Sequence, residues 1–313
     1  MNHKHAVARV RDCCLTSVLI YGIASAQDVP SHVDLEANRD ALVEWLATDQ
    51  TGPEFYAESV PFEGGAETNI ALIVEDIDIE SMNEILKGPD AWCEIMFLHL
   101  NVKSCVYGES EGRQWIRLYM GRKFYQDPNK AEQIELEFDS GITGDGVSWA
   151  TLTADEGPFN TSDYYVGLFA IEANNGSYAQ IRSSQKTGGA MTRAMNLYFN
   201  TLARSKVGFS VVGTDRRGDP RYSRGTQAML ERNVVRYLLA LRTLMETHTI
   251  AGLQGVRIRT RSWYDATERY AEQLHEVERE DYLRDKEKEY QHQVEMQAAV
   301  NDSQLNPSSG SVR

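Results

Sequence analysis

The feature that most constrains this chain is a long helical segment near its C-terminal end, residues 225–247. Its apolar residues, spaced at helical intervals, are Met229, Leu230, Val234, Val235, Tyr237, Leu238, Leu239, Leu241 and Leu244. They cover most of the helix circumference, whereas a surface helix keeps one broad polar face. The rest of the chain must therefore supply a surface that wraps around residues 225–247.

Residues 98–184 are predicted to supply that surface as an antiparallel sheet. Apolar residues recur there at every second position, most clearly where Ile134, Leu136 and Phe138 alternate with polar residues. A period of two with one polar face is typical of antiparallel strands. The sequence predicts an α+β fold in which a curved antiparallel sheet of about six to seven strands wraps around the long helix.

Shorter elements precede and follow these strands. An aspartate, Asp78, stands where a helix is expected to begin, and its carboxylate can accept hydrogen bonds from the free N–H groups of the first turn. The shorter elements are predicted helices at residues 36–48, 79–87 and 190–203, and predicted strands at residues 55–62 and 68–74.

The first 26 residues have the three parts of a secretory signal peptide. Basic residues come first, the apolar run Cys13–Ile23 follows, and the small residues Ala24–Ala26 place Gln27 at the predicted mature N-terminus. The apolar run has 11 residues, whereas a bilayer span needs about 20. We therefore expect a periplasmic or secreted protein without a stable membrane span.

Removal of residues 1–26 makes the chain more acidic. The net charge of the whole chain is −14, and the loss of Lys4, Arg9, Arg11 and Asp12 brings it to −16. Negative charge of this size repels nucleic acids and anionic lipid headgroups. No nucleic-acid partner is predicted.

Two of the four cysteines leave with the signal, so Cys93 and Cys105 remain. In an oxidising compartment such a pair favours a disulfide that closes a short loop and stabilises the fold by about 3 kcal/mol. The alternative is two separate buried thiols. No CxxC or HxxxH spacing accompanies the pair, so neither a metal nor another cofactor is predicted.

The predicted order of elements resembles that of the START-like superfamily (SRPBCC, Bet v1-like), whose members have the helix-grip fold. The resemblance covers residues 38–247, and residues 91–105, 206–209 and 231–237 are similar to exported bacterial proteins of unassigned function. It implies a START-like helix-grip domain with an internal cavity that binds, or transports, a lipid or other hydrophobic small molecule. The alternative from the same resemblance is an enzyme of the cyclase or hydrolase type acting on a hydrophobic substrate.

Polar residues in the middle of the long helix are candidates for orienting that ligand. Arg232 and Arg236 are four residues apart and share a face with Asn233 beside them. If that face meets the cavity, these side chains hold a carboxylate, phosphate or hydroxyl group; otherwise they reach solvent or pair with carboxylates of the sheet. The predicted ligand-binding set also contains aromatic residues of the domain, namely Tyr237, Trp92, Tyr119, Trp149 and Tyr198.

No catalytic residue is predicted. His99 is the histidine that falls within the predicted sheet, and the period of two places it on a polar, solvated face with Asn101 and Lys103. Gly208–Gly213 has one residue too many for the G-x-S-x-G turn that carries a serine nucleophile.

Beyond the usual end of such a domain, residues 263–298 are predicted to form a charged amphipathic helix, and residues 299–313 a disordered tail. Tyr270, Leu274 and Val277 make an apolar stripe that docks either on the domain or on a protein partner. A third candidate function is therefore a non-catalytic interaction protein that uses this helix.

Overall fold

The computed structural model describes residues 28–48, 53–62, 65–157, 161–187 and 206–305. The signal segment 1–26, the helix predicted for residues 190–203 with its Tyr198, and residues 306–313 lie outside these described residues. Those three predictions therefore stay predictions.

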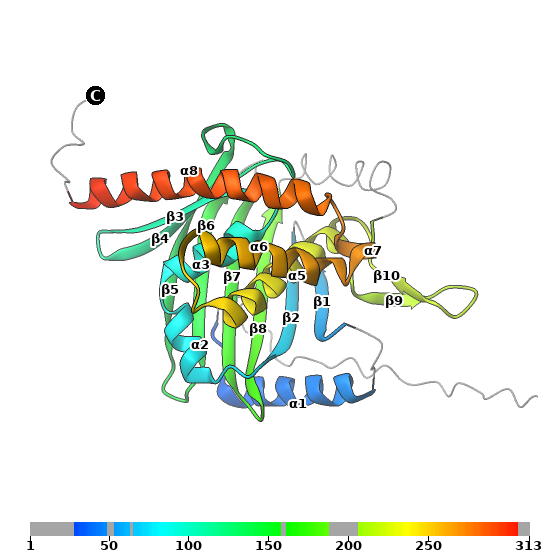
Figure 1. The fold of residues 1–313 in the computed structure, drawn as a ribbon. Coiled ribbons are helices and arrows are strands. Elements are labelled where there is room, and N and C mark those ends of the chain that lie inside the picture. Colours follow the sequence, from blue (N-terminus) through cyan, green and yellow to red (C-terminus); the bar gives the residue numbers. More distant parts are fainter. Residues whose placement is uncertain (1–27, 49–52, 63–64, 158–160, 188–205, 306–313) are drawn as a thin grey trace, which may run out of the picture.

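The predicted antiparallel sheet is confirmed, with eight strands in the described part of the chain (Figure 1). Their spatial order is β1-β2-β8-β7-β6-β5-β4-β3, and all neighbours are antiparallel. The β1–β2 hairpin joins the meander through β2 and β8, which is why the count exceeds the six to seven strands expected. The strands are β1 (Phe55–Phe62), β2 (Gly65–Glu75), β3 (Val102–Ser110), β4 (Arg113–Met120), β5 (Glu132–Ile142), β6 (Ser148–Gly157), β7 (Thr161–Ala173) and β8 (Gly176–Thr187).

The long helix α5 (Gly225–Thr247) lies against one face of the sheet, as the helix-grip arrangement requires (Figure 1). Val235, Leu238 and Ala240 are completely buried between α5 and its neighbours. Burial of apolar area at about 25 cal/mol per Å² is the main stabilising contribution here. The prediction that this helix is an internal one is confirmed.

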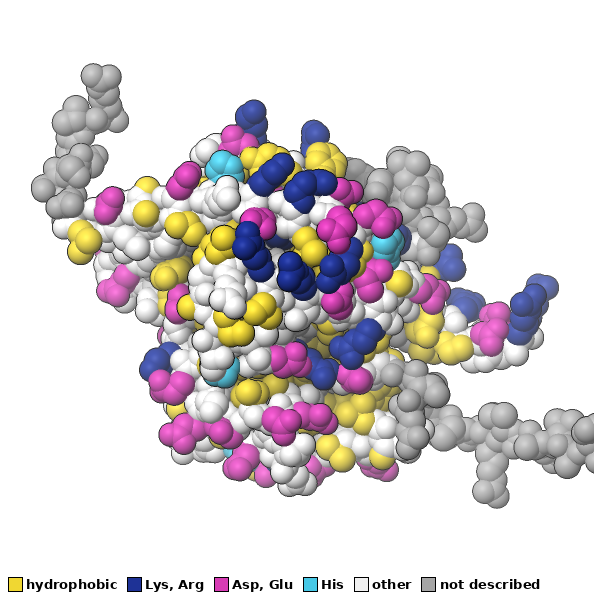
Figure 2. Space-filling view, in the orientation of Figure 1, with side chains coloured by type: hydrophobic (Ala, Val, Ile, Leu, Met, Phe, Trp, Pro, Cys, Tyr) yellow, Lys and Arg dark blue, Asp and Glu magenta, His cyan; other side chains and the backbone are white. Residues whose placement is uncertain are grey.

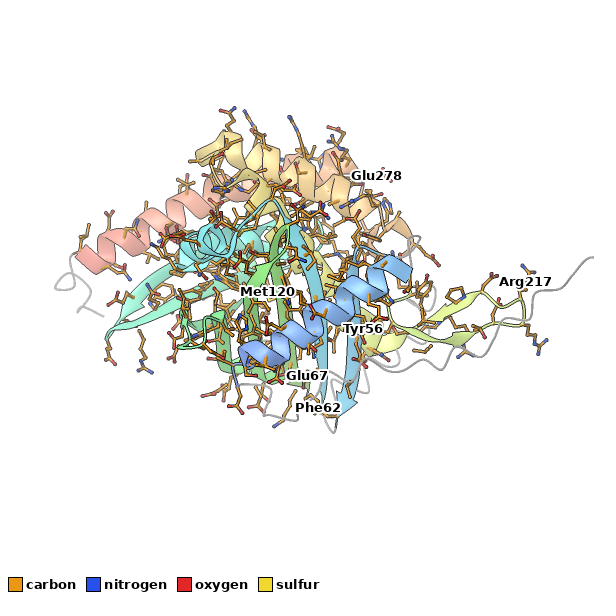
Figure 3. The ribbon with its side chains drawn as sticks, turned by 90° about the horizontal axis from the view of Figure 1, so that it is seen from below. Tyr56, Phe62, Glu67, Met120, Arg217 and Glu278 are labelled. Atoms are coloured by element: carbon orange, nitrogen blue, oxygen red, sulfur yellow. A yellow bond between two sulfur atoms is a disulfide. The ribbon has the colours of Figure 1, made fainter. Side chains whose placement is uncertain are left out.

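Helix α1 (His32–Thr48) covers the opposite face of the sheet, and Figure 3 shows it from below. Leu35 and Leu42 pack there on Phe169 and Tyr178, while Leu168 of the same strand faces the core around α5. Side chains alternate between the two faces of a strand, so β7, covered on both faces, has no polar aliphatic or charged residue over positions 164–171. This explains the lack of clear alternation in its sequence.

Two short helices, α2 (Ile79–Leu86) and α3 (Pro89–Leu98), connect β2 to β3. Asp78 caps α2 as predicted, since its carboxylate accepts a hydrogen bond from the Ser81 N–H at 2.7 Å. The predicted disulfide Cys93–Cys105 is confirmed and joins α3 to β3, with 5.2 Å between the two Cα atoms. Its sequence separation is 12 residues, so it fixes one helix on the adjacent edge strand.

The single helix predicted for residues 263–298 is wrong, because the chain forms three helices in this region. They are α6 (Gly252–Glu268), α7 (Ala271–Leu274) and α8 (Arg279–Leu305). Tyr270 leaves the helical conformation at φ −119° and ψ 44°, which separates α6 from α7. The stripe of Tyr270, Leu274 and Val277 packs on the main core, and α8 continues to Leu305, into the segment predicted as a tail.

Helix α8 covers the edge strand β3 and pairs with its backbone through glutamine side chains. Gln293 Oε1 accepts from the Cys105 N–H at 2.8 Å, and Gln297 both accepts from the Tyr107 N–H and donates to the Tyr107 carbonyl, each at 2.9 Å. An uncovered edge strand presents unpaired N–H and C=O groups and invites association with another chain. These side chains supply the hydrogen bonds that a ninth strand would otherwise supply.

Ion pairs also connect α6 to α8 at the surface, where basic side chains gather on the face shown in Figure 2. Arg257 of α6 pairs with Glu287 of α8 at 2.5 Å, and both side chains are well exposed. Exposed pairs of this kind stabilise a fold by at most about 1 kcal/mol. The buried contacts of α8 therefore matter more for its position.

The remaining described elements are short. A 3₁₀ turn, η1 (Pro128–Lys130), precedes β5, and a two-stranded hairpin, β9 (Val211–Thr214) and β10 (Pro220–Tyr222), precedes α5. Figure 3 shows this hairpin extending from the body of the protein, with Arg217 near its tip. Within the described ranges, no helix combines the length and the apolar character that crossing a bilayer requires.

Candidate functional site

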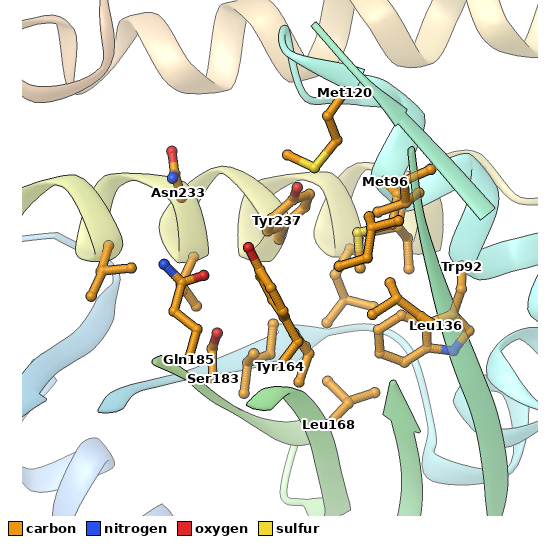
Figure 4. A pocket seen from close by; sticks show the side chains of 18 residues that line it. Trp92, Met96, Met120, Leu136, Tyr164, Leu168, Ser183, Gln185, Asn233 and Tyr237 are labelled. Atoms are coloured by element: carbon orange, nitrogen blue, oxygen red, sulfur yellow. The ribbon is translucent and has the colours of Figure 1, made fainter. Parts of the chain in front are cut away.

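A cavity of about 130 Å³ lies between α5, α3 and the sheet (Figure 4). Alternate residues of the strands and one face of α5 form its wall. The apolar lining residues are Trp92, Ile95, Met96, Leu118, Met120, Ile134, Leu136, Val166, Leu168, Ile181, Leu230, Val234 and Leu241. Protein interiors have few voids larger than a water molecule, so a space of this size within the core marks a candidate binding site.

Five polar residues complete the lining that the described residues form, and no charged residue is among them. Tyr164, Ser183 and Gln185 come from the sheet, and Asn233 and Tyr237 from α5. Figure 4 shows them toward one end of the cavity, while Trp92, Met96 and Leu136 lie toward the other. The cavity therefore has an apolar end and an uncharged polar end.

The two tyrosine hydroxyls of the polar end stay protonated at neutral pH. Burial raises the pKa of Tyr237 well above its ordinary value, and burial also raises the pKa of Tyr164. A protonated hydroxyl both donates and accepts a hydrogen bond. The polar end can thus pair with a hydroxyl or a carbonyl without a proton transfer.

The prediction that His99 lies on a solvated strand face is wrong. His99 ends helix α3, is 3 % exposed, and stacks on the Tyr237 ring with 5.0 Å between the ring centres. Burial lowers its pKa well below the ordinary value, and the charge of Arg236 acts in the same direction. The Asn101 N–H donates to its Nδ1 at 3.2 Å, so the neutral ring supports Tyr237 from behind.

Arg232 and Arg236 are not among the residues that line the cavity. Arg236 donates to the Leu274 carbonyl at 3.1 Å and pairs with Glu276 at 3.3 Å. Burial lowers the pKa of Arg236 to about 10, against the opposing effect of Glu276, so the guanidinium is charged at neutral pH. Arg232 donates to the Val207 carbonyl at 3.2 Å. Both arginines bind neighbouring loops, and Glu276, the carboxylate that pairs with Arg236, lies between α7 and α8 and not on the sheet, as the alternative had expected.

Of the predicted aromatic residues, Trp92 and Tyr237 line the cavity with Asn233, and two others do not. Tyr119 lies between Leu118 and Met120, which face the cavity, so its side chain points to the other side of β4. Trp149 lines a separate depression near Ser140 on the surface.

The sequence analysis did not single out Tyr164, Ser183 and Gln185. The period of two could have predicted that they face the cavity. Tyr164 shares a strand face with Val166 and Leu168. Ser183 and Gln185 share a strand face with Ile181. Polar residues that continue an apolar strand face toward its end are candidates for the polar end of a cavity.

The Gly208–Gly213 segment has a structural role. Ser210 Oγ donates to the Ala57 carbonyl at 3.2 Å, and the buried Glu231 carboxylate accepts from the N–H groups of Phe209 and Ser210. The serine hydroxyl therefore has no histidine partner among the described residues. No group of histidine, cysteine and acidic residues suited to a metal ion occurs among them either.

Comparisons with known proteins give similarities of fold alone. No protein-family model matches the chain, and no curated protein matches it. A conserved protein of unknown function from Enterococcus faecalis is similar over 73 % of this chain and 96 % of its own, with 9 % identity and a TM-score of 0.35. Human STARD10 is similar over 56 % of this chain and 78 % of its own, with 7 % identity and a TM-score of 0.29.

Norcoclaurine synthase from Thalictrum is similar over 63 % of this chain and 99 % of its own, with 7 % identity and a TM-score of 0.30. At these TM-scores the fold assignment rests on the strand order and on the position of α5 in this structure.

Proposed function

We propose that this protein is a START-like binding protein that holds one small hydrophobic molecule in the cavity between α5 and the sheet. The observation that carries the proposal is the cavity itself, about 130 Å³ of mainly apolar space in the core. An empty cavity costs about 24 cal/mol per Å³, or about 3 kcal/mol for this volume. A bound molecule that restores packing contacts recovers that free energy.

The volume limits the size of the buried part of the ligand. An engineered cavity of about 150 Å³ admits benzene, while typical ligand sites have about 300–1,000 Å³. A space of about 130 Å³ therefore suits a single ring or a short branched chain. A longer lipid fits only with part of its length outside this cavity or with the cavity expanded.

Binding without chemical change is favoured over catalysis by the groups that face the cavity. In the described part of the chain they are hydroxyls and amides, with no carboxylate, imidazole or amine among them. A general acid or base acts best with a pKa near the working pH, whereas burial raises the pKa of both lining tyrosines. We therefore place the enzyme alternative second.

We propose further that the protein works outside the cytoplasm. The Cys93–Cys105 disulfide supports this compartment, because disulfides persist in oxidising surroundings and are rare in reducing ones. Mass analysis of the protein exported by its own host is expected to show Gln27 as the first residue. A soluble exported form that keeps residues 1–26 would contradict this proposal.

A cavity-filling variant tests the binding proposal directly. Val166 lines the cavity, so Val166→Phe is expected to occupy the space, abolish binding of toluene and preserve or raise the melting temperature. The matched control is Val43→Phe, since Val43 is 52 % exposed on α1 at the other face of the sheet. Toluene binding is measured by calorimetry and by two-dimensional NMR.

Native mass spectrometry of protein purified from its own host, with extraction of the bound molecule, provides the second measurement. We expect a co-purifying hydrophobic compound at one per chain in the unchanged protein and in the control, and none in Val166→Phe. Equal binding of toluene by Val166→Phe and the unchanged protein would refute the cavity as the site.

A further inference from the structure

We infer that the cavity selects an uncharged molecule with one hydroxyl or carbonyl group at its polar end, and excludes carboxylates, phosphates and amines. This inference rests on the proposed function and adds the chemical class of the ligand. It follows from which polar groups face the cavity and from where the nearby charges are directed.

The polar end offers hydrogen bonds that the protein itself does not use. Within the described part of the chain, the side chains of Tyr237, Ser183 and Gln185 make no hydrogen bond to other protein groups, and all three line the cavity. Asn233 is already engaged, since its Oδ1 accepts from Arg236 at 3.5 Å and its side chain also forms a hydrogen bond with His99, so the unused groups are those of Tyr237, Ser183 and Gln185. Such groups pair with a ligand or with water inside the cavity.

The type of these groups matches a neutral partner. Amides and protonated hydroxyls can each donate and accept, so they satisfy a hydroxyl, which does both, or a carbonyl, which accepts. The polar lining residues come partly from α5 and partly from the sheet. One ligand group can therefore be held from both sides. Figure 4 shows Tyr164 and Gln185 across from Asn233 and Tyr237.

Among the described residues that line the cavity, a charged ligand group has no counter-ion. The cations nearest in sequence to the lining of α5 are Arg232 and Arg236, and both are directed to partners in the protein. Glu276 pairs with Arg236 and Lys206 outside the lining, and also contacts Lys123. An ion that enters the cavity therefore loses its water without gaining an opposite charge, which strongly disfavours it.

Three probes of similar size separate these contributions. Toluene has no polar group, 4-methylphenol adds a neutral hydroxyl, and 4-methylbenzoate adds a negative charge at pH 7. We expect 4-methylphenol to bind about 5–10-fold more tightly than toluene, as one net hydrogen bond allows. We expect 4-methylbenzoate to bind at least 10-fold more weakly than 4-methylphenol.

Two variants identify the groups responsible. Tyr237→Phe keeps the ring stacked on His99 and removes the hydroxyl, so it is expected to abolish the preference for 4-methylphenol and leave toluene binding unchanged. Gln185→Leu, on the sheet side, is expected to reduce the same preference. The control Tyr178→Phe removes a tyrosine hydroxyl from the opposite face of the sheet and is expected to change none of the three affinities.

The outcomes distinguish this inference from the proposed function. Toluene binding with 4-methylbenzoate as tight as 4-methylphenol, or with a preference that survives in Tyr237→Phe, would overturn the inference and leave the binding function standing. Failure of all three probes to bind the unchanged protein would overturn both.

Discussion

Replacement of Glu289 by glutamine is expected to destabilise the protein far more than an ordinary surface substitution. Glu289 lies on the buried face of α8 and is the carboxylate between two lysines, with Lys103 Nζ at 2.8 Å and Lys286 Nζ at 3.0 Å. The side chains of all three residues are at most 2 % exposed. Glutamine keeps the shape and removes the charge, so both buried lysines lose the carboxylate that they share.

The magnitude follows from what each lysine retains. Burial lowers the pKa of Lys286 to about 8 even though Glu289 raises it, so without Glu289 this lysine can lose its proton at pH 7 at a cost of less than about 1.4 kcal/mol. Lys103 keeps the Leu100 carbonyl at 2.8 Å but no charged partner. Loss of one member of a buried ion pair costs about 3–5 kcal/mol, and we expect Glu289→Gln to lie in that range.

Urea unfolding followed by circular dichroism measures this change. The control Glu287→Gln is two residues away on α8, where the exposed pair with Arg257 predicts a loss of less than about 1 kcal/mol. Lys286→Met leaves Lys103 and Glu289 as a balanced pair, so its expected loss is below about 1.5 kcal/mol. A loss from Glu289→Gln no larger than that from Glu287→Gln or Lys286→Met would refute this account of the charge balance.

Three further predictions concern the same region. The folded pKa of Lys286 is about 8, below its ordinary 10.5, so the unfolded chain binds more protons between these values. The free energy of unfolding of the unchanged protein relative to Lys286→Met should therefore rise by about 2–3 kcal/mol from pH 8 to pH 10, and a fall would contradict the assignment. Cys105→Ala should lower stability by up to about 3 kcal/mol, and the unreduced, denatured protein should show no thiol that reacts at Cys93 or Cys105. Gln297→Leu removes two hydrogen bonds to the Tyr107 backbone and should cost about 1–3 kcal/mol in urea unfolding; Gln291→Leu on the same helix, which has no such bond among the described contacts, should cost much less.

Much of the fold could be predicted because periodicity is a local property of the chain. Residues 133–138 have a period of two, which predicts a strand with one buried face, and β5 agrees with it. Residues 225–247 are apolar around most of the helix, which predicts a buried helix, and α5 agrees with it. The turn at Asn174–Gly176 likewise connects β7 to β8 as expected. Such patterns depend on residues a few positions apart, which the sequence displays directly.

The candidate site was only partly predictable for the same reason. Asn233 and Tyr237 line the cavity because the apolar helix had to face the core, and Trp92 lines it from α3, a helix that the sequence analysis did not predict. Arg232 and Arg236 share the helix with Asn233, yet their partners Val207, Leu274 and Glu276 come from other segments. Helical spacing indicates which residues share a face, and it does not indicate what that face meets.

The sequence alone therefore determined the period-two strands and the burial of the long helix, and it favoured the pairing of Cys93 with Cys105. Only the tertiary structure decided that the polar positions His99 and Lys103 are buried. His99 packs on Tyr237 of α5, and α8 covers Lys103 with Glu289, which lies 186 residues farther along the chain. A strand face with polar residues is equally compatible with water and with a distant helix that carries matching charges. The choice between them is made by the free energy of packing α8 on β3, which no local pattern contains.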